Sequence, residues 1–327
     1  MIRTPPPPPR SRTRITRRLG ALVALGSALA LGSSGATPGR AASSPLPEGA
    51  PSGGGDEANA AQERVVLITG STDGLGREVA LELAEPGTLI LVHGRNRERG
   101  EEVVRAIQEA GGAARFHQAD LADMDQVKAL GETLLREHER LDLLINNAGI
   151  WLSPEGGRQV NDSGHEMHFA VNYLSHYVLT HTLLPLLKAA PSARIINVAS
   201  IAQRPLDFDD VMLENGYSDG RAYAQSKLAQ ILFTVDLAEE LEGTGILVTA
   251  LHPATMMNTT MVLSRGAQAR ASVEEGVEAV LQQVRSPDVE SGQYFDGLQE
   301  ARAHEQAYDP EARRLLREMS REWTGVP

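Results

Sequence analysis

The chain has 327 residues, of which 41% are hydrophobic and 23% are charged. These fractions are close to the globular average and exclude a wholly disordered or fibrous chain. The absence of cysteine excludes disulfides, thiolate nucleophiles and cysteine-ligated metal centres. A formal net charge of −12 argues against a nucleic-acid partner, because phosphate contacts need a basic surface.

Residues 1–62 differ in composition from the rest of the chain. A basic segment ending in Arg17-Arg18 precedes an apolar run over Leu19–Leu31, and small residues and prolines follow. For a bacterial protein this predicts an export signal, and the arginine pair resembles a twin-arginine signal. The run is too short for an integral membrane span, which needs about 20 residues. A mis-assigned start codon in a cytoplasmic protein and an organelle transit peptide are the alternatives.

From residue 63 onward, strand-like apolar runs alternate with helical patterns. Val65–Thr69 is a continuous apolar run that ends at a glycine, as expected of a buried parallel strand. Helices are predicted over Gly76–Ala84 and after a capping box formed by Asp123 and Gln126. Further strands are predicted at Thr88–Val92, Leu141–Ile145, Arg194–Val198, Ile246–Leu251 and Gln293–Phe295.

This alternation is typical of βαβ units. It predicts an α/β fold, in which a single doubly wound Rossmann-type domain over residues 63–327 contains a parallel sheet of about seven strands, with helices on both faces. Residues 1–62 are then a leader outside the fold.

A glycine-rich turn follows the first predicted strand. Gly70, Gly74 and Gly76 are spaced as Gly-x-x-x-Gly-x-Gly. Glycine there allows a tight turn and close approach of the backbone to a pyrophosphate, and the following helix offers N–H donors. The alternative is a glycine turn without a ligand.

Tyr223 and Lys227 are four residues apart in a helical stretch, so their side chains share one face. A nearby cation favours the phenolate and lowers the tyrosine pKa from about 10. Such a tyrosine can act as a general acid and base. The alternative is an ordinary surface helix.

Together with further motifs, these features resemble the short-chain dehydrogenase/reductase family, in its compact single-domain subclass. The resemblance covers residues 64–300. Because of the long gap between Ser200 and Tyr223, the chain is most similar to the retinol-dehydrogenase-like branch. The other matching motifs are Asp120 after a strand, Asn146-Asn147-Ala148-Gly149, Asn172, Ser200, Gln225–Ala229 and Tyr294-Phe295-Asp296.

The resemblance implies hydride transfer between a nicotinamide and a carbonyl or alcohol carbon. It implies that Tyr223 is the general acid/base, that Ser200 hydrogen-bonds the substrate oxygen and that Lys227 holds the ribose and lowers the tyrosine pKa. Asn172 would anchor a water in the proton relay. The cofactor-binding residues it implies are Gly70, Ser71, Thr72, Asp73, Gly74, Leu75, Gly76, Arg95, Asn96, Asp120, Leu121, Asn147, Ala148, Gly149, Tyr223, Lys227, Pro253 and Thr255, with Thr259 as an alternative to Thr255.

The end of the second strand predicts the choice of cofactor. An acidic residue there would bind the ribose 2′-hydroxyl of NAD, whereas this chain has Gly94 followed by Arg95. Arginine suits a 2′-phosphate, so NADP(H) is expected over NAD(H). Asp73 argues against this, because many NADP-preferring relatives have a basic residue there.

The expected activity is therefore that of an NADP-dependent oxidoreductase acting on a small, apolar carbonyl or alcohol substrate. The alternative is a catalytically silent NADP-binding sensor or scaffold. We expect a homo-oligomer, no nucleic-acid partner and no metal site, although His165 and His168 could be considered as ligands. The apolar loop around Met256 and Met261 is either core or a lid over the substrate. Ala254 replaces the glycine that the family usually has after Pro253.

Overall fold

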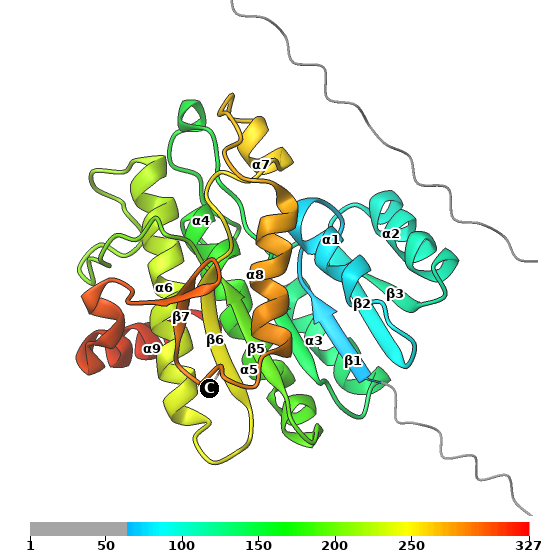
Figure 1. Cartoon of the computed structure of the whole chain (residues 1–327). Coiled ribbons are helices and arrows are strands. Elements are labelled where there is room, and N and C mark those ends of the chain that lie inside the picture. Colours follow the sequence, from blue (N-terminus) through cyan, green and yellow to red (C-terminus); the bar gives the residue numbers. More distant parts are fainter. Residues whose placement is uncertain (1–63, 327) are drawn as a thin grey trace, which may run out of the picture. The chain divides into compact units, whose positions relative to one another are not determined.

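An eight-stranded sheet organises residues 64–326, the part of the chain that the computed structural model describes (Figure 1). The strand order is β3-β2-β1-β4-β5-β6-β7-β8, and all neighbours are parallel except β7 and β8. The strands are β1 Arg64–Ile68, β2 Thr88–Gly94, β3 Ala113–Gln118, β4 Leu143–Asn146, β5 Arg194–Val198, β6 Leu247–His252, β7 Tyr294–Asp296 and β8 Gln299–Ala301. The predicted leader, residues 1–62, lies outside the described residues.

These strands confirm the predicted doubly wound α/β fold. The sheet has eight strands rather than about seven, because the chain turns back at Gly297 and adds the short β8 antiparallel to β7. Gly297 has a φ of +58°, a left-handed conformation that favours glycine and permits the tight turn.

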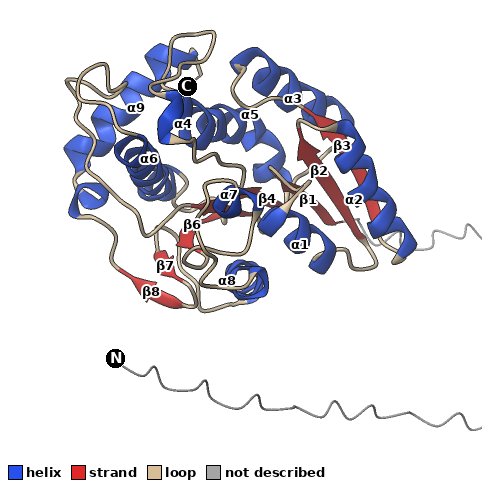
Figure 2. Cartoon of the chain, turned by 90° about the horizontal axis from the view of Figure 1, so that it is seen from above, coloured by secondary structure: helices blue, strands red, loops and turns tan. Residues whose placement is uncertain are grey.

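Helices cover both faces of the sheet (Figure 2). One buried core joins α1, α2 and α8 to the sheet, and the other joins α3, α5, α6 and α9 to it. The helices are α1 Gly74–Glu82, α2 Arg97–Glu109, α3 Met124–Glu137, α4 Met167–Phe169, α5 Ser175–Ala189, α6 Asp219–Glu240, α7 Thr260–Leu263, α8 Val273–Arg285 and α9 Pro310–Thr324, with short 3-10 turns at Pro154–Gly156 and Glu305–Tyr308. Within the described residues, no helix is both long and apolar enough to cross a membrane.

A π-helical turn, η2, connects α4 to α5 over Ala170–Leu174. It contains Asn172, one of the predicted catalytic residues. π-Turns are rare and are found mostly at functional sites, because they add a residue to a helix without ending it.

Buried amides connect the two central strands to the helices beneath them. Asn146 Nδ2 on β4 donates to Asn197 Oδ1 on β5 at 2.9 Å and to Thr180 Oγ1 on α5 at 3.0 Å. Asn197 Nδ2 in turn donates to Thr234 Oγ1 on α6 at 2.9 Å. This network fixes α5 and α6 to the sheet near the reversal of strand order between β1 and β4, where doubly wound sheets bind ligands.

Candidate active site

The glycine turn between β1 and α1 has no room for side chains at two positions. A Cβ on Gly70, which has a φ of +65°, would lie 2.9 Å from Ala148 Cα. A Cβ on Gly76 would lie 2.4 Å from Asn147 Nδ2 and 2.5 Å from Gly70 O. Glycine is therefore required at both positions, and the backbone forms the open cradle expected for a pyrophosphate.

The Asn-Asn-Ala-Gly motif holds this turn directly. Asn147 Nδ2 donates to the carbonyls of Thr69 at 2.8 Å and Gly70 at 3.2 Å. Thr69 Oγ1 accepts from the backbone N–H groups of Asn147 and Ala148, both at 2.9 Å. The two motifs, almost 80 residues apart in the sequence, thus form one structural unit.

His93, at the end of β2, also supports the turn and was not predicted from the sequence. Its Nδ1 accepts from Gly70 N at 3.1 Å, and its own N–H donates to Ser71 Oγ at 3.0 Å. Burial lowers the pKa of His93 to about 4, so the ring is neutral and Nδ1 can accept. Ser71 N donates to His93 O and Ser71 Oγ to Ile68 O, so its polar groups hold the turn against β2. The only signal in the sequence was a polar residue inside an apolar strand.

The remaining donors of the turn belong to the start of α1. Asp73 Oδ1 accepts from Gly74 N at 2.8 Å and caps the helix. Leu75 and Gly76 follow in its first turn, before the first hydrogen bond of the helix, from Arg77 N to Asp73 O. The N–H groups of such residues are the ones that helix termini offer to phosphates.

Charged residues surround the end of β2. Arg95 Nη1 lies 3.6 Å from Asp120 Oδ2, and 67% of the Arg95 side chain is exposed. Arg99 Nη1 lies 3.6 Å from Asp73 Oδ2. A basic group therefore lies beside Asp73, the residue that argued against NADP in the sequence. Asn96 Oδ1 caps α2 by accepting from Arg99 N at 3.0 Å. A Cβ on Gly94 would lie 2.5 Å from Thr72 Cγ2.

Asp120 and its neighbours form the next wall. Asp120 Oδ1 accepts from Ala122 N at 3.0 Å, and Leu121 is buried in the core. Of the predicted capping box, Asp123 Oδ1 does accept from Gln126 N, at 3.2 Å. The other half is wrong, because Gln126 Oε1 accepts from Asp120 N rather than from the N–H of Asp123.

Asn172 in η2 is fully engaged by the protein. Its Oδ1 accepts from Ile150 N at 2.7 Å, and its Nδ2 donates to Ile150 O at 3.1 Å and to Ser226 Oγ at 2.9 Å. Both amide hydrogens are used, so the side chain fixes the loop after β4, at Ile150, to α6. Only the side-chain oxygen could also accept from a water.

Ser200, Tyr223 and Lys227 come together at the carboxyl end of β5. Burial raises the pKa of Tyr223, and a hydrogen bond with the Ser200 side chain lowers it. Burial lowers the pKa of Lys227 to about 7, and its Nζ lies 5.9 Å from the Tyr223 ring. Burial of Tyr223 is the larger influence, so within the polypeptide alone the pKa of this tyrosine is raised.

An aromatic and cationic layer covers Tyr223. The Trp151 ring lies 5.3 Å from the Tyr223 ring, and Arg265 Cζ lies 4.0 Å from the other ring centre, that of Trp151. Arg265 Nη2 is held by Asp219 Oδ2 at 2.7 Å. The segment after α7 is thus fastened to the start of α6, beside the predicted general acid.

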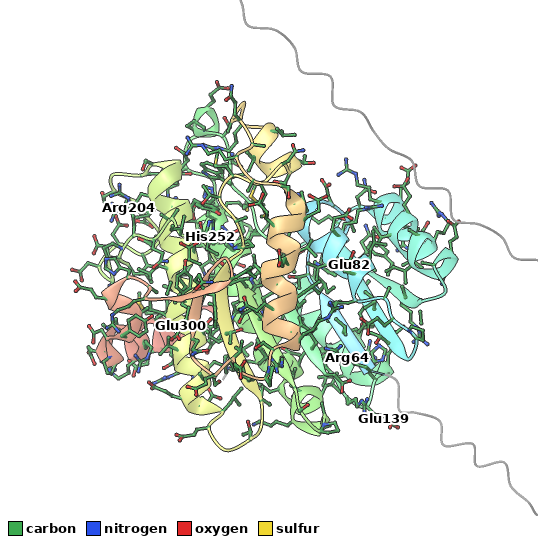
Figure 3. All side chains as sticks on the ribbon, in the orientation of Figure 1. Arg64, Glu82, Glu139, Arg204, His252 and Glu300 are labelled. Carbon is green, nitrogen blue, oxygen red and sulfur yellow. The ribbon has the colours of Figure 1, made fainter. Side chains whose placement is uncertain are left out.

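The loop after β6 contains Thr255, Thr259 and Ala254, three residues that the sequence analysis singled out. Thr255 Oγ1 lies 3.0 Å from Nε2 of His252, which is at the end of β6 (Figure 3). Thr259 Cγ2 instead lies 3.3 Å from the position that a Cβ on Gly74 would take. Thr259 is therefore the threonine that lies against the glycine turn. Ala254, beside the buried Pro253, is not in the left-handed region, which is adopted instead by Met256 with a φ of +53°.

The same loop is partly core and partly exposed. Val262 is buried, whereas Leu263 has half of its surface exposed. Met257 packs against the core on the α8 side of the sheet.

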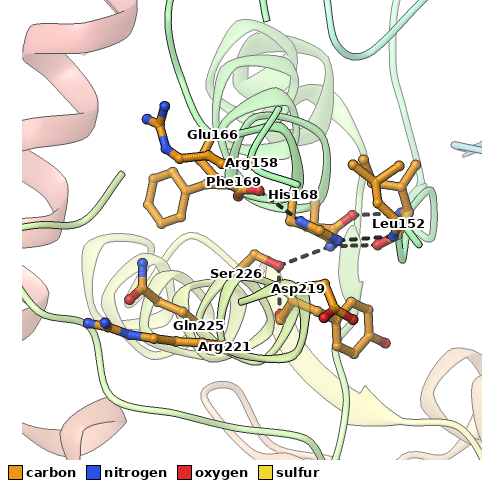
Figure 4. A network of polar contacts seen from close by, with 12 residues as sticks. Leu152, Arg158, Glu166, His168, Phe169, Asp219, Arg221, Gln225 and Ser226 are labelled. Atoms are coloured by element: carbon orange, nitrogen blue, oxygen red, sulfur yellow. Dashed lines mark hydrogen bonds and ion pairs between the residues drawn. The ribbon is translucent and has the colours of Figure 1, made fainter. Parts of the chain in front are cut away.

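The structure assigns His168 to a structural role. Its Nδ1 lies 2.8 Å from the buried Glu166 Oε1, and its Nε2 accepts from Leu152 N at 3.1 Å (Figure 4). Both ring nitrogens are therefore engaged within the protein, and His165 packs 5.9 Å from the Trp323 ring.

Comparison with known sequences identifies the family of this chain. The family model "short chain dehydrogenase" matches residues 64–270. Mouse retinol dehydrogenase 14 is 35% identical over 84% of this chain and 89% of its own length, and human retinol dehydrogenase 13 is 36% identical over 79% and 84%.

Solved structures share this fold. An uncharacterised protein of Mycobacterium paratuberculosis aligns with a TM-score of 0.67 and 28% identity, over 80% of this chain and 94% of its own. A metagenomic short-chain oxidoreductase in complex with NADP aligns with a TM-score of 0.54 and 26% identity, over 70% and 94%. The chain therefore belongs to the short-chain dehydrogenase family, in its retinol-dehydrogenase-like branch, and is an NAD(P)-dependent oxidoreductase of alcohols or carbonyl compounds.

Proposed function

We propose that this enzyme uses NADP(H) to interconvert an apolar alcohol and the corresponding carbonyl compound. The observation that carries the cofactor proposal is the cradle around Gly70 and Gly76, where added Cβ atoms would collide with the neighbouring backbone and with Asn147. The cofactor supplies the hydride chemistry when bound, and the protein positions it. Arg95 and Arg99 offer guanidinium groups after the end of β2 that would hold a ribose 2′-phosphate.

Apolar side chains support the proposed substrate class. Ile201, directly after Ser200, and Leu263 of α7 each have about half of their surface exposed and can contact an apolar substrate. Both lie in segments that border the predicted catalytic residues. The relatives named above are retinol dehydrogenases, which fits an apolar alcohol.

The proposed mechanism assigns one task to each of four side chains. Tyr223 donates a proton to the carbonyl oxygen in reduction and accepts it in oxidation. Ser200, already hydrogen-bonded to Tyr223, orients the same oxygen. Lys227 contributes an N–H to the ribose and a positive charge near the tyrosine, while Asn172 keeps Ile150 and α6 in register.

Tyr223→Phe tests the proposal because it removes the transferable proton and keeps the ring. We expect turnover on a panel of apolar ketones, aldehydes and alcohols to fall at least ~100-fold, the usual contribution of a general acid/base. Cofactor affinity, measured by NADPH fluorescence, should hardly change. Near wild-type turnover in Tyr223→Phe would contradict the assignment, and tight NADPH binding without turnover on any substrate would favour a silent sensor.

A further inference from the structure

Lys227 is held by two acceptors on its buried side. Its Nζ donates to Val198 O on β5 and to Gln230 Oε1, one helical turn further along α6, both at 2.8 Å. Only 3% of Lys227 is exposed. Two of the three ammonium hydrogens are thus directed by the protein, which leaves one for the cofactor side.

Gln230 continues this contact into a buried polar chain. Its Nε2 lies 3.1 Å from His176 Nδ1 on α5, and His176 Nε2 lies 3.3 Å from Thr69 Oγ1 in the cofactor turn. Thr69 Oγ1 is the same atom that accepts from the backbone of Asn147 and Ala148. Thr69, His176 and Gln230 are completely buried. An unbroken series of contacts therefore runs from the pyrophosphate cradle to the catalytic lysine.

The charge of Lys227 dictates how the side chains of Gln230 and His176 are oriented. An ammonium group has only donors, so Gln230 must present its oxygen to it and its Nε2 to His176. His176 must then accept at Nδ1, which requires a neutral ring. Burial, and next the positive charge of Lys227, lower the pKa of His176 to about 3, in agreement with this requirement.

We propose that His176 and Gln230 are positioning residues that stabilise the ammonium form of Lys227 and fix its Nζ relative to the cofactor turn. The proposal rests on the role of Lys227 in the proposed function. Gln230 acts on Lys227 directly, and His176 acts by holding the carboxamide of Gln230 in the orientation that faces Lys227.

Among residues 64–326, no anion faces Lys227 that could perform this task instead. The titratable groups that face it within the described residues are Tyr223 on α6, His176 on α5 and His252 at the end of β6, whose pKa is lowered first by burial and also by the lysine charge. None of the three is anionic at neutral pH, and burial is the influence that lowers the pKa of Lys227. Neutral acceptors must therefore stabilise the ammonium group.

The composition of the chain allows a direct measurement. Lys128, Lys188 and Lys227 are the only lysines, so 13C-lysine-labelled enzyme should give three side-chain signals, and Lys227→Arg identifies the relevant one. Its chemical shift is followed from pH 5 to 10 in the wild type, Gln230→Met and Gln230→Glu. These two variants have similar volume and differ in what they offer to Nζ.

We expect opposite shifts of the Lys227 midpoint. Gln230→Met removes an acceptor and should lower the midpoint by ~1 pH unit. Gln230→Glu adds an opposite charge and should raise it by ~1 unit or more. The high-pH limb of kcat/KM should move in the same two directions, which a purely structural role of Gln230 would not produce. A midpoint that stays unchanged, or that moves the same way in both variants, would overturn the proposal.

His176→Phe tests the part of the buried polar series that lies beyond Gln230. It keeps a flat ring but removes the acceptor for Gln230, so the Lys227 midpoint should fall, and the KM for cofactor should rise more than kcat falls. An unchanged midpoint in a folded His176→Phe would remove His176 from the proposal. If a Gln230 variant does not fold, the folded one decides by the direction of its midpoint. The titration needs no turnover, so it can succeed even if Tyr223→Phe disproves the proposed function.

Discussion

The preference for NADP(H) should depend mainly on Arg95. Its side chain is 67% exposed and its Nη1 lies 3.6 Å from Asp120 Oδ2, so the exposed pair is weak and Arg95 can turn toward a phosphate at little cost. A hydrogen bond to a charged group contributes about 1.5–3 kcal/mol, and the exposure of Arg95 places it at the lower end. Arg95→Ala should therefore reduce kcat/KM for NADPH about 10-fold more than for NADH.

The assay is the ratio of kcat/KM values for the two cofactors at one ionic strength. Arg97→Ala is the matched control, because Arg97 follows two residues later, at the start of α2, but pairs with Glu101 and lies over the Phe116 ring. The control should leave the ratio within about twofold of the wild type. A wild type that already favours NADH, or equal effects of the two variants, would refute the reasoning.

The converse substitution needs a second change. Gly94→Asp should repel the 2′-phosphate and favour NADH, but its Cβ would lie 2.5 Å from Thr72 Cγ2 and 2.8 Å from Thr72 Oγ1. Thr72→Ala removes both atoms and leaves a Cβ at 3.3 Å. We expect Gly94→Asp to lose activity with both cofactors unless it is combined with Thr72→Ala, and Thr72→Ala alone is the control.

Two further predictions concern the glycine turn. Gly76→Ala should cost about 1–3 kcal/mol of unfolding free energy and most of the cofactor affinity, because its Cβ would meet Asn147 and the Gly70 carbonyl, whereas Gly220→Ala, with open space around it, should be harmless in urea unfolding and NADPH titration. His93 binds protons less readily when folded than when unfolded, since its pKa falls from 6.5 to about 4. Stability should therefore decrease as pH falls from 6.5 to about 4, by up to ~3 kcal/mol, and His93→Gln should lessen that decrease if the reasoning is correct.

The sequence was most informative where one residue type has one physical use. The strands of the buried sheet are continuous apolar runs, so β1, β2, β5 and β6 were predicted within two residues of their observed ends. The short β8 was missed because Gln299-Glu300-Ala301 is a polar edge strand without alternation, although the Asp-Gly pair before it favours a hairpin.

The supporting residues of the site were harder to foresee. Glycine spacing and the Tyr-x-x-x-Lys pair are local patterns, and the structure brings these residues together. His93, His176 and Gln230 act through contacts with residues far away in the sequence, so no local spacing identifies them. The missing half of the capping box has a local cause, since the nearby Asp120 N–H donates to Gln126 Oε1 in place of the Asp123 N–H.

The π-turn η2 makes the length of this helix part of the site. In an α-helix each residue advances the helical direction by roughly 100°. Because the π-turn closes i→i+5 bonds, it absorbs one residue more than an α-helical turn, so removing a single residue from Ala170–Leu174 would restore regular winding and shift the register of Asn172 against one of the flanking helices. Asn172 lies inside this turn and His176 just after it in α5, and they meet different partners, Ile150 and Gln230. The extra residue thus determines which partners the two faces of this helix contact.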